Sequence, residues 1–346
     1  MKAFQFKEWL TPAELVDVPV PEPGPDEVLI RIGGAGVCHS DLHVMHSWTP
    51  QTRPEVALWS LPFTLGHENA GWIESGDTED VEAGMPVVVQ PLWNCGFCRA
   101  CLRGNTNSCE APREKRGRSG GLGRDGGFAE YMVAPAHCVV PLKDLEPWKA
   151  AALTDAGLSS YHAVKRCLPF LSPDVAVTVI GIGGLGQMAL EFLRELCGAK
   201  IIAVDQDEKA LKRAADLGAH KCLLSDDSTA VEIQKATNGL GAMCVIDLVG
   251  TDATMALAAQ ATRKNGRIVI VGLGGGMFQF RFGALPFGCS MVTTMGGSTP
   301  ELAEVIALAE AGRVKPLIEK YKLEQAVEVY DKLKNNQITG RAVLVP

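Results

Sequence analysis

The pattern of hydrophobic and polar positions divides the chain into two parts near Pro147. In the first part, short apolar runs alternate with turn-forming segments such as Pro19–Glu27. The runs that predict strands are Val28–Ile32, Ala70–Glu74, Met85–Gln90 and Cys138–Leu142. Short strands at these spacings favour a β-barrel or a sandwich-like unit over a βαβ unit.

In the second part, predicted strands alternate with predicted helices. The helices are Thr154–Leu168, Leu185–Leu196, Glu208–Leu217 and Thr254–Ala261. The strands are Ala176–Ile180, Ile201–Asp205, Val245–Leu248 and Arg267–Gly272. This alternation is typical of a parallel, doubly wound sheet. Near the C-terminus, Glu301–Val314 predicts an amphipathic helix, and Arg341–Pro346 predicts a strand that could return to the first part.

The composition of the chain limits the binding partners and the cellular compartment that we expect. The 346 residues suggest two domains, and 47% hydrophobic with 21% charged residues is an ordinary globular balance. A net charge of −7 disfavours binding to nucleic acid and to anionic membranes. The N-terminus lacks the apolar segment of a signal peptide, and no apolar run reaches the length of about 18 residues that a membrane helix needs. We therefore expect a cytoplasmic protein without a membrane or nucleic-acid partner.

A glycine-rich motif joins the predicted strand Ala176–Ile180 to the helix that follows it. Gly181, Gly183 and Gly186 form the pattern G-x-G-x-x-G. Glycines at these places permit a tight turn, close approach of the backbone to a pyrophosphate, and packing of the helix on the strand. Asp205, at the end of the next strand, can accept hydrogen bonds from ribose hydroxyls and would repel a 2′-phosphate. The motif predicts NAD rather than NADP, and a glycine-rich turn without a ligand is the alternative.

Four of the eleven cysteines are close together in the sequence: Cys95, Cys98, Cys101 and Cys109. Thiolates gathered this tightly in a reducing compartment can complete a tetrahedral zinc site. Four protein ligands leave no open position, so the predicted role of this zinc is structural. An iron–sulfur cluster is one alternative, although the fourth cysteine lacks the continuation found in ferredoxins. Free cysteines are the other.

A second set of metal-binding residue types is spread over three segments. Its members are Cys38, His39, Ser40, Asp41 and His43, then His67 and Glu68, and finally Asp155. One cysteine, one histidine and one carboxylate could bind zinc and leave a fourth position free, as a catalytic zinc requires. Spacing alone does not establish this site, because Cys38 could be a core thiol and His67 a buried histidine with satisfied hydrogen bonds.

The order and separation of these motifs resemble those of the zinc-dependent medium-chain alcohol dehydrogenases over essentially the whole chain. The shared motifs are CHSD at 38–41, GHE at 66–68, the four cysteines, TDAG at 154–157, GIGGLG at 181–186, and Asp205. The chain looks closest to bacterial secondary alcohol dehydrogenases, which reduce ketones and aryl ketones.

The resemblance implies an α/β protein with two domains. A GroES-like catalytic domain would comprise residues 1–155 and 298–346 and include a structural zinc lobe at about 93–112. A Rossmann domain that binds NAD would comprise residues 156–297. The resemblance further implies two zinc ions per chain, one catalytic and one structural. It also implies a homotetramer, with a dimer as the alternative.

The resemblance also assigns roles around the catalytic zinc. Cys38, His67 and Asp155 fall on its ligands, and many relatives have a second cysteine in place of Asp155. The aspartate keeps two anionic ligands, so the formal charge of the site does not change. Glu68 falls on a residue that can act as a transient ligand, and Asp41 falls on the acid that orients the histidine ligand.

Further roles concern the proton and the cofactor. Ser40 falls on the hydroxyl that takes the substrate proton, and His43 falls on the histidine that passes it to solvent. A surface histidine without this role is the alternative for His43. The residues expected to contact NAD are His39, Ser159, Gly181, Gly183, Gly184, Leu185, Gly186, Asp205 and Val271.

Four large apolar side chains are candidates for the substrate pocket: Trp48, Trp59, Trp93 and Met295. They would suit a hydrophobic or aryl substrate, although each could be a core residue instead.

The basic segment 113–118 is a solvated loop or, alternatively, a phosphate contact. We expect reversible hydride transfer between NAD(H) and an alcohol/ketone pair, with a hydrophobic or aryl secondary alcohol as substrate.

Several alternatives remain. A dehydrogenase of primary alcohols or polyols, or one that oxidises a glutathione adduct of formaldehyde, would use the same zinc sites. A zinc-free reductase would not need Cys38, His67 and Asp155. A non-enzymatic NAD-binding protein would not need Ser40 and His43.

Overall fold

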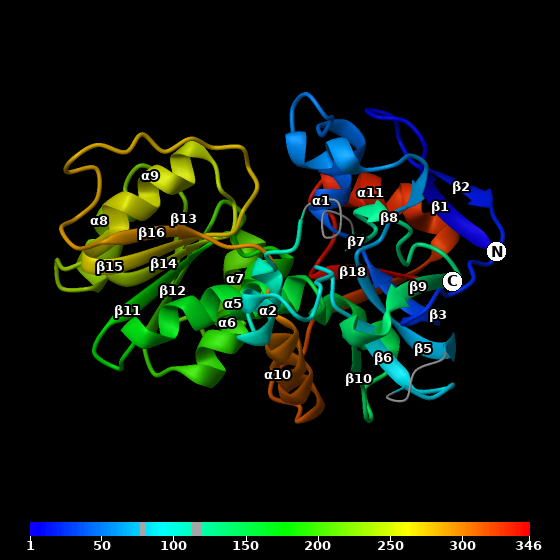
Figure 1. Ribbon diagram of the computed structural model, residues 1–346. Helices are drawn as coiled ribbons and strands as arrows, with labels where there is room; N and C mark the ends of the chain where they lie inside the picture. The colour runs from blue at the N-terminus through cyan, green and yellow to red at the C-terminus, as the bar shows by residue number, and fades with distance from the viewer. Residues whose placement is uncertain (77–80, 113–118) are drawn as a thin grey trace. The chain divides into compact units, whose positions relative to one another are not determined.

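The computed structural model describes residues 1–76, 81–112 and 119–346 (Figure 1). The basic segment 113–118 therefore lies outside the described residues. The backbone forms two compact units, one comprising Met1–Leu158 and Gly296–Pro346 and the other Ser159–Met295. In the described part of the chain, no helix combines the length and the apolar character needed to cross a membrane.

The first unit is built mainly of strands. Their bounds are β1 (Lys2–Phe6), β2 (Glu14–Asp17), β3 (Glu27–Gly36), β4 (Phe63–Thr64), β5 (Glu68–Gly76), β6 (Pro86–Val89), β7 (Ser119–Gly120), β8 (Gly123–Arg124), β9 (Tyr131–Pro135), β10 (Val139–Pro141), β17 (Ile318–Lys322) and β18 (Arg341–Val345). One sheet has the order β2-β1-β4, and the larger sheet has the order β10-β6-β5-β3-β18-β17, with β9 also paired to β3. The four strands predicted in this part of the chain overlap β3, β5, β6 and β10.

Short helices connect these strands. The α-helices are α1 (His39–His46), α2 (Arg99–Leu102), α4 (Pro147–Ala150), α10 (Thr299–Glu310) and α11 (Ala326–Lys334), and the 3-10 helices are η1 (Pro54–Leu58), η2 (Thr106–Ser108), η3 (Ala136–Cys138), η4 (Ala151–Leu153) and η6 (Leu323–Gln325). Helix α10 begins and ends earlier than the predicted Glu301–Val314. The Ser298 side chain caps its start by accepting the Glu301 N–H, and Gly312, with φ +70°, follows its end.

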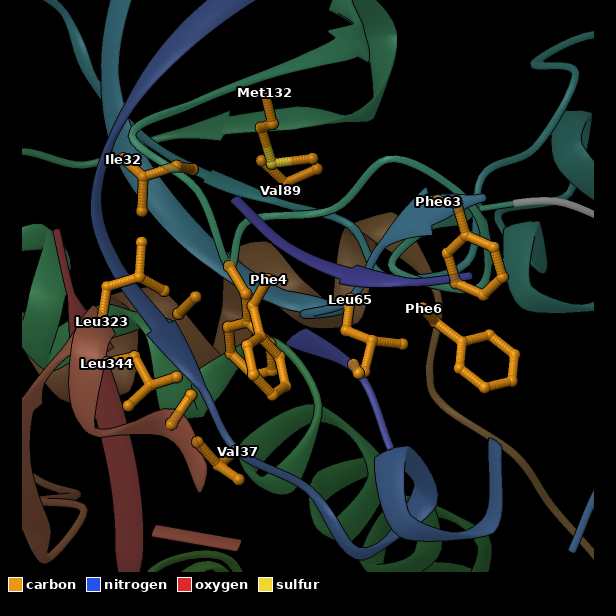
Figure 2. Packing of buried hydrophobic residues seen from close by; sticks show 14 of the residues in the cluster. Phe4, Phe6, Ile32, Val37, Phe63, Leu65, Val89, Met132, Leu323 and Leu344 are labelled. Carbon is orange, nitrogen blue, oxygen red and sulfur yellow. The ribbon is translucent and has the colours of Figure 1, made fainter. Parts of the chain in front are cut away.

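The C-terminal strand belongs to the first unit, as the sequence predicted. In β18, Val343 and Leu344 pair antiparallel with Gly36 and Ala35 of β3. Figure 2 shows Leu344 in the same buried cluster as Phe4, Ile32 and Leu323. Burying a side chain of this size stabilises a fold by about 1.5–3 kcal/mol, so packing holds these distant segments together.

The second unit is a parallel six-stranded sheet with helices on both faces (Figure 1). Its strands are β11 (Ala176–Ile180), β12 (Lys200–Asp205), β13 (Lys221–Leu224), β14 (Ala242–Asp247), β15 (Thr262–Ile270) and β16 (Ser290–Thr293), and its helices are α5 (Ala156–Cys167, which starts in the first unit), η5 (Leu168–Phe170), α6 (Gly184–Leu196), α7 (Glu208–Asp216), α8 (Thr229–Ala236) and α9 (Asp252–Ala261). The strand order β13-β12-β11-β14-β15-β16 is that of a Rossmann fold. The predicted doubly wound sheet is confirmed.

Within the second unit, the elements that the sequence pattern missed lie mainly at the margins of the sheet; in the first unit it also missed strands such as β1, β9 and β17 and the helices α1 and α11. Strands β13 and β16 are the two edge strands of the six-stranded sheet, and their side chains are mostly only half-buried. An edge strand needs no continuous apolar run, so these four-residue segments do not stand out in the sequence. Helix α8 was also missed, and β15 begins at Thr262, before the predicted Arg267.

Candidate active site

Donor atoms from three distant segments meet in the first unit. One ligand atom each from Cys38, His67, Glu68 and Asp155 lies within 4.8 Å of all the others. Cys38 precedes α1, His67 and Glu68 stand at the start of β5, and Asp155 precedes α5. The Asp155 Oδ2 atom lies 3.6 Å from both Cys38 Sγ and His67 Nε2.

These separations fit a metal site. Donors held about 2.0–2.3 Å from one tetrahedral zinc ion would lie roughly 3.3–3.8 Å apart. The distances from Asp155 Oδ2 to Cys38 Sγ and to His67 Nε2 lie in that range, and the three atoms are the sulfur, nitrogen and oxygen donors that zinc accepts. Three such ligands leave one coordination position for a substrate, which is the arrangement of a catalytic zinc.

The Asp41 carboxylate supports two of these donors. Its Oδ1 atom lies 3.1 Å from His67 Nδ1, and its Oδ2 atom accepts the Cys38 backbone N–H at 3.0 Å. Both Asp41 and His67 are buried. A carboxylate on Nδ1 can orient the imidazole so that Nε2 points toward the other donors, and this role stays a prediction for Asp41.

The Ser40 hydroxyl lies directly against the same donors. Its Oγ atom donates to Cys38 Sγ at 3.0 Å and lies 3.2 Å from His67 Nε2. Ser40 stands in the first turn of α1, immediately before Asp41. The fold therefore brings a hydroxyl group into contact with two of the donor atoms.

The structure adds a residue that the sequence analysis missed, Arg341 of β18. Its Nε donates to Glu68 Oε2 at 2.9 Å, and its Nη2 contacts Glu68 Oε1 and lies 3.8 Å from Asp155 Oδ2. Arg341 and Glu68 are both buried. Burial raises the pKa of Glu68 to about 7, and the guanidinium of Arg341 acts in the opposite direction.

Glu68 is therefore held by an ion pair beside the donor group. A side chain at Gly36 would overlap the Glu68 carboxylate, so glycine at this position keeps the space open. The only sequence signal for Arg341 was a charged residue opening an otherwise apolar strand. That signal does not say which acid the arginine meets, because the partner is set by the pairing of β18 with β3.

The four cysteines form a second cluster in the first unit. Cys98 Sγ lies 3.4 Å from Cys101 Sγ and 3.9 Å from Cys109 Sγ, and Cys109 Sγ lies 3.6 Å from Cys95 Sγ. These separations fit four thiolates around one zinc ion. The backbone N–H groups of Cys101 and Glu110 lower the pKa of Cys98 to about 6, which favours the thiolate form that a metal needs.

The glycine-rich motif has the geometry of a dinucleotide site. Gly181, with φ +90°, makes the turn after β11, and Gly183 precedes α6 with open space where a side chain would stand. A Cβ on Gly186 would overlap the Gly181 carbonyl, so glycine is needed for α6 to pack there. The open N-terminus of α6 can bind a pyrophosphate.

Asp205 lies beside this motif, at the end of β12. Its Oδ2 atom accepts the Ile182 N–H at 2.6 Å, and its Oδ1 atom accepts the Asp207 N–H at 2.9 Å. The carboxylate thus holds the glycine-rich turn. Ser159 is buried in the same unit, and Leu185 and Val271 are half-buried there. Contacts of these residues with NAD remain predictions.

The residues predicted for proton transfer, cofactor contact and the substrate pocket differ in burial and in the unit to which they belong. His43 is half-buried on α1, and its ring stacks on Trp48, which in turn contacts Trp59 edge to face. His39, expected near the cofactor, is exposed. Trp93 is buried in the core of the first unit. Met295 belongs to the second unit and is 59% exposed, so it does not join the tryptophans within one unit.

Comparison with known proteins matches two successive parts of the chain to two families. Residues 24–144 match the alcohol dehydrogenase GroES-like domain, and residues 184–311 match the zinc-binding dehydrogenase family. The chain is 37% identical over 354 residues to an NAD-dependent alcohol dehydrogenase of Sulfurisphaera tokodaii, and the match covers 100% of both proteins.

Two further relatives differ in substrate. A D-arabinose 1-dehydrogenase (NADP(+)) of Saccharolobus solfataricus is 36% identical over 351 residues, which cover 100% of this chain and 97% of the relative. The structure of an acetophenone reductase from Geotrichum candidum in complex with NAD has a TM-score of 0.84 and 29% identity. That match covers 100% of this chain and 97% of the relative.

The two domain families account for most of the chain, and the identity to a curated enzyme extends from end to end. The donor group at Cys38 and the dinucleotide motif at Gly181 are the features that such an enzyme needs. The protein belongs to the zinc-dependent medium-chain alcohol dehydrogenases and is an NAD-linked oxidoreductase.

Proposed function

We propose that the protein interconverts an alcohol and its ketone and that its preferred substrate is a hydrophobic or aryl secondary alcohol. The observation that carries this proposal is the donor group of Cys38, His67 and Asp155, with the Ser40 hydroxyl 3.0 Å from Cys38 Sγ. When bound, zinc supplies Lewis acidity at this position and NAD supplies the hydride acceptor. The remaining steps fall to side chains of the chain itself.

Ser40 and His43 would remove the substrate proton. The Ser40 Oγ atom would accept it, and His43 would pass it to solvent. Partial burial and the charge of Arg53 lower the pKa of His43. The neutral ring, which can accept a proton, is therefore present over a wider range of pH.

We further propose two zinc ions per chain and a preference for NAD over NADP. Cys38, His67 and Asp155 would hold the catalytic ion, and the four-cysteine cluster would hold the structural ion. Asp205 would accept hydrogen bonds from the adenosine ribose. The cysteines of the described residues form no disulfide bond, which supports location in the reducing cytoplasm.

Three observations bear on the substrate. Trp48 and Trp59 form a continuous aromatic cluster with Trp9 and Phe63, which would suit an aryl group. One relative is named for acetophenone, an aryl ketone, and this supports the same substrate class. Another relative is named for D-arabinose, which makes a polyol or sugar the second candidate.

Initial rates with matched alcohols test the substrate class. We expect faster NAD reduction with 1-phenylethanol and 2-butanol than with benzyl alcohol, 1-butanol or D-arabinose, and slower rates with NADP in every case. A clear preference for the primary alcohols or for D-arabinose would overturn the proposed substrate and leave the assignment to the family intact.

We also propose that the second unit pairs with a copy of itself along β16, within a homotetramer or a dimer. β16 is an edge strand, and the segment before it exposes large apolar side chains. These are Leu273 (45%), Met277 (78%), Phe280 (77%), Phe282 (88%) and Phe287 (65%). A sheet edge beside so much exposed apolar surface is typical of an interface.

Light scattering coupled to size-exclusion chromatography tests this interface. The wild-type protein should elute as a tetramer or a dimer, and Phe280→Asp with Phe282→Asp should shift it to a smaller species. Val231→Asp, on the exposed surface of α8, is the control and should not change the mass. A monomeric wild-type protein would refute the proposed assembly.

A further inference from the structure

We propose that Trp48 and Arg53 form a clamp on His43, in which the Trp48 ring fixes the plane of the imidazole and the Arg53 guanidinium opposes a positive charge on it. The inference deepens the proposed function, because it rests on His43 as the group that releases the proton. Both clamp residues would be positioning residues that act through His43.

The local backbone brings the three side chains together. His43 lies in the last turn of α1, and the Trp48 backbone N–H donates to the His43 carbonyl at 2.8 Å, which folds the chain back at the end of the helix. The Arg53 N–H then donates to the Thr49 carbonyl at 2.8 Å. The whole clamp thus lies within eleven consecutive residues, 43–53, and needs no contact with the second unit.

The rings of His43 and Trp48 lie nearly parallel. The ring centroids of His43 and Trp48 are 6.1 Å apart, and the ring planes differ by 9°. Trp48 is held in turn by Trp59, whose centroid lies 6.1 Å away at 63°. A histidine that must hand on a proton needs one reproducible orientation, and a flat apolar neighbour restricts its rotation without competing for its nitrogen atoms.

Arg53 adds a permanent positive charge to this group. Its Cζ atom lies 4.2 Å from the centroid of the Trp48 ring, a typical cation–π distance. The nearest described acid is Glu55, whose carboxylate is 4.0 Å away and 59% exposed, so it neutralises Arg53 only weakly. A guanidinium near a histidine disfavours the imidazolium form.

Two further histidines stand on α1, His39 one turn before His43 and His46 at the end of the helix. For His43, burial and then Arg53 lower the pKa. The consequence is a relay histidine that remains neutral, and able to accept a proton, at lower pH than an unclamped histidine.

The direct test follows the pKa of His43 in the full-length, zinc-loaded protein by exchange of its C2 hydrogen, read by mass spectrometry across pH. In Arg53→Gln, we expect the midpoint of the His43 profile to move to higher pH, whereas Arg53→Lys, which keeps the charge, should stay near the wild type. Arg31→Gln is the matched control, because it removes another Arg–Trp contact, 4.5 Å from the Trp72 ring. An unchanged midpoint in Arg53→Gln would refute the electrostatic half of the clamp.

Steady-state kinetics test the orienting half. With 2-butanol, which has no aryl group to contact Trp48, we expect Trp48→Leu to lower kcat about tenfold with little change in KM. Trp48→Phe should restore most of the lost kcat, because a flat ring again lies beside His43. A role in substrate binding alone would instead raise KM by amounts that depend on the size of the substrate. That result would refute the orienting role.

Failure of the clamp can be separated from failure of the proposed proton path. His43→Gln should lower kcat and remove the acidic limb of the pH profile if His43 is the relay. If His43→Gln has no effect, the proton path is wrong, and the exchange midpoints in Arg53→Gln still decide whether Arg53 acts on His43.

Discussion

The two clusters that could hold a metal ion lie in the same unit but are assembled from very different lengths of chain. The four cysteines come from a single segment, residues 95–109. The donor group of Cys38, His67 and Asp155 comes from three segments, and the ion pair beside it adds Arg341 from the C-terminal strand. The first cluster depends on local turns, whereas the second depends on how β3, β5 and β18 pair.

The clusters also differ in electrostatics. In the cysteine cluster, backbone N–H groups lower the pKa of Cys98 to about 6, and burial raises the pKa of Cys101 to about 12. The cluster of Cys38, His67 and Asp155, which we call the distributed cluster, combines sulfur, nitrogen and oxygen donors. It lies beside a buried acid, Glu68, whose charge is balanced by Arg341. Four like ligands make a closed site, and three unlike ligands beside an ion pair leave room for a substrate.

Removing one ligand of the distributed cluster should reduce catalytic activity the most. We expect Asp155→Ala to lower kcat/KM on the order of 10³-fold, which corresponds to about 4 kcal/mol of lost transition-state stabilisation. Metal analysis should show one zinc lost per chain and one retained. Full activity with both ions retained would show that Asp155 is not a ligand.

Breaking the ion pair tests whether the distributed cluster depends on β18. In Arg341→Met, Glu68 remains buried without its partner, and we expect a loss of about 3–5 kcal/mol in the free energy of unfolding. Adding Glu68→Gln should recover most of that loss, because the buried charge is then gone. Chemical denaturation of both variants measures the difference, and equal stabilities would contradict the coupling.

The stability of the Arg341→Met variant should depend on pH. Burial already raises the pKa of Glu68 to about 7, and removing Arg341 raises it further. A carboxyl whose pKa is higher in the folded than in the unfolded protein stabilises the fold at low pH, and that stability is lost as pH rises through the folded pKa. Arg341→Met should therefore lose more stability at pH 8 than at pH 5, and a loss that does not change with pH would contradict this origin.

Disrupting the four-cysteine cluster should lower activity less, and the loss of structure should be confined to one segment. We expect Cys101→Ser to release one zinc and to lower stability by roughly 2–4 kcal/mol, with faster hydrogen exchange limited to residues near 95–109. kcat should fall far less than in Asp155→Ala. A loss of activity as large as in that variant would show that the two clusters are coupled.

In the second unit, Asp205 belongs to the predicted NAD site. Like the four-cysteine cluster, this site comes from neighbouring segments of the chain. Hydrogen bonds to a charged group contribute about 1.5–3 kcal/mol, so Asp205→Ala should reduce the NAD/NADP ratio of kcat/KM roughly ten- to hundredfold. Asp207→Ala, which removes the neighbouring cap of α7, is the control for loss of local structure. An unchanged ratio would exclude Asp205 as the selectivity residue.

Much of the fold could be predicted because it follows short-range patterns. The alternation after Ala176 indicated the parallel sheet, and Gly181, Gly183 and Gly186 marked its first turn. The edge strands β13 and β16 could not be predicted in the same way, because half-buried side chains leave no apolar run. The grouping of Cys38, His67 and Asp155 came from resemblance to a family, since their spacing alone would equally suit a core thiol and a buried histidine.

The sequence by itself determined the features whose parts are neighbours in the chain: the four-cysteine segment, the dinucleotide motif and the class of fold. Tertiary structure decided the contact of Arg341 with Glu68, the need for glycine at position 36, and the stacking of His43 on Trp48. The physical reason is that contacts between side chains depend on the direction in which each one leaves the backbone. Strand register and helix ends set that direction, and neither can be read from the identity of the residue alone.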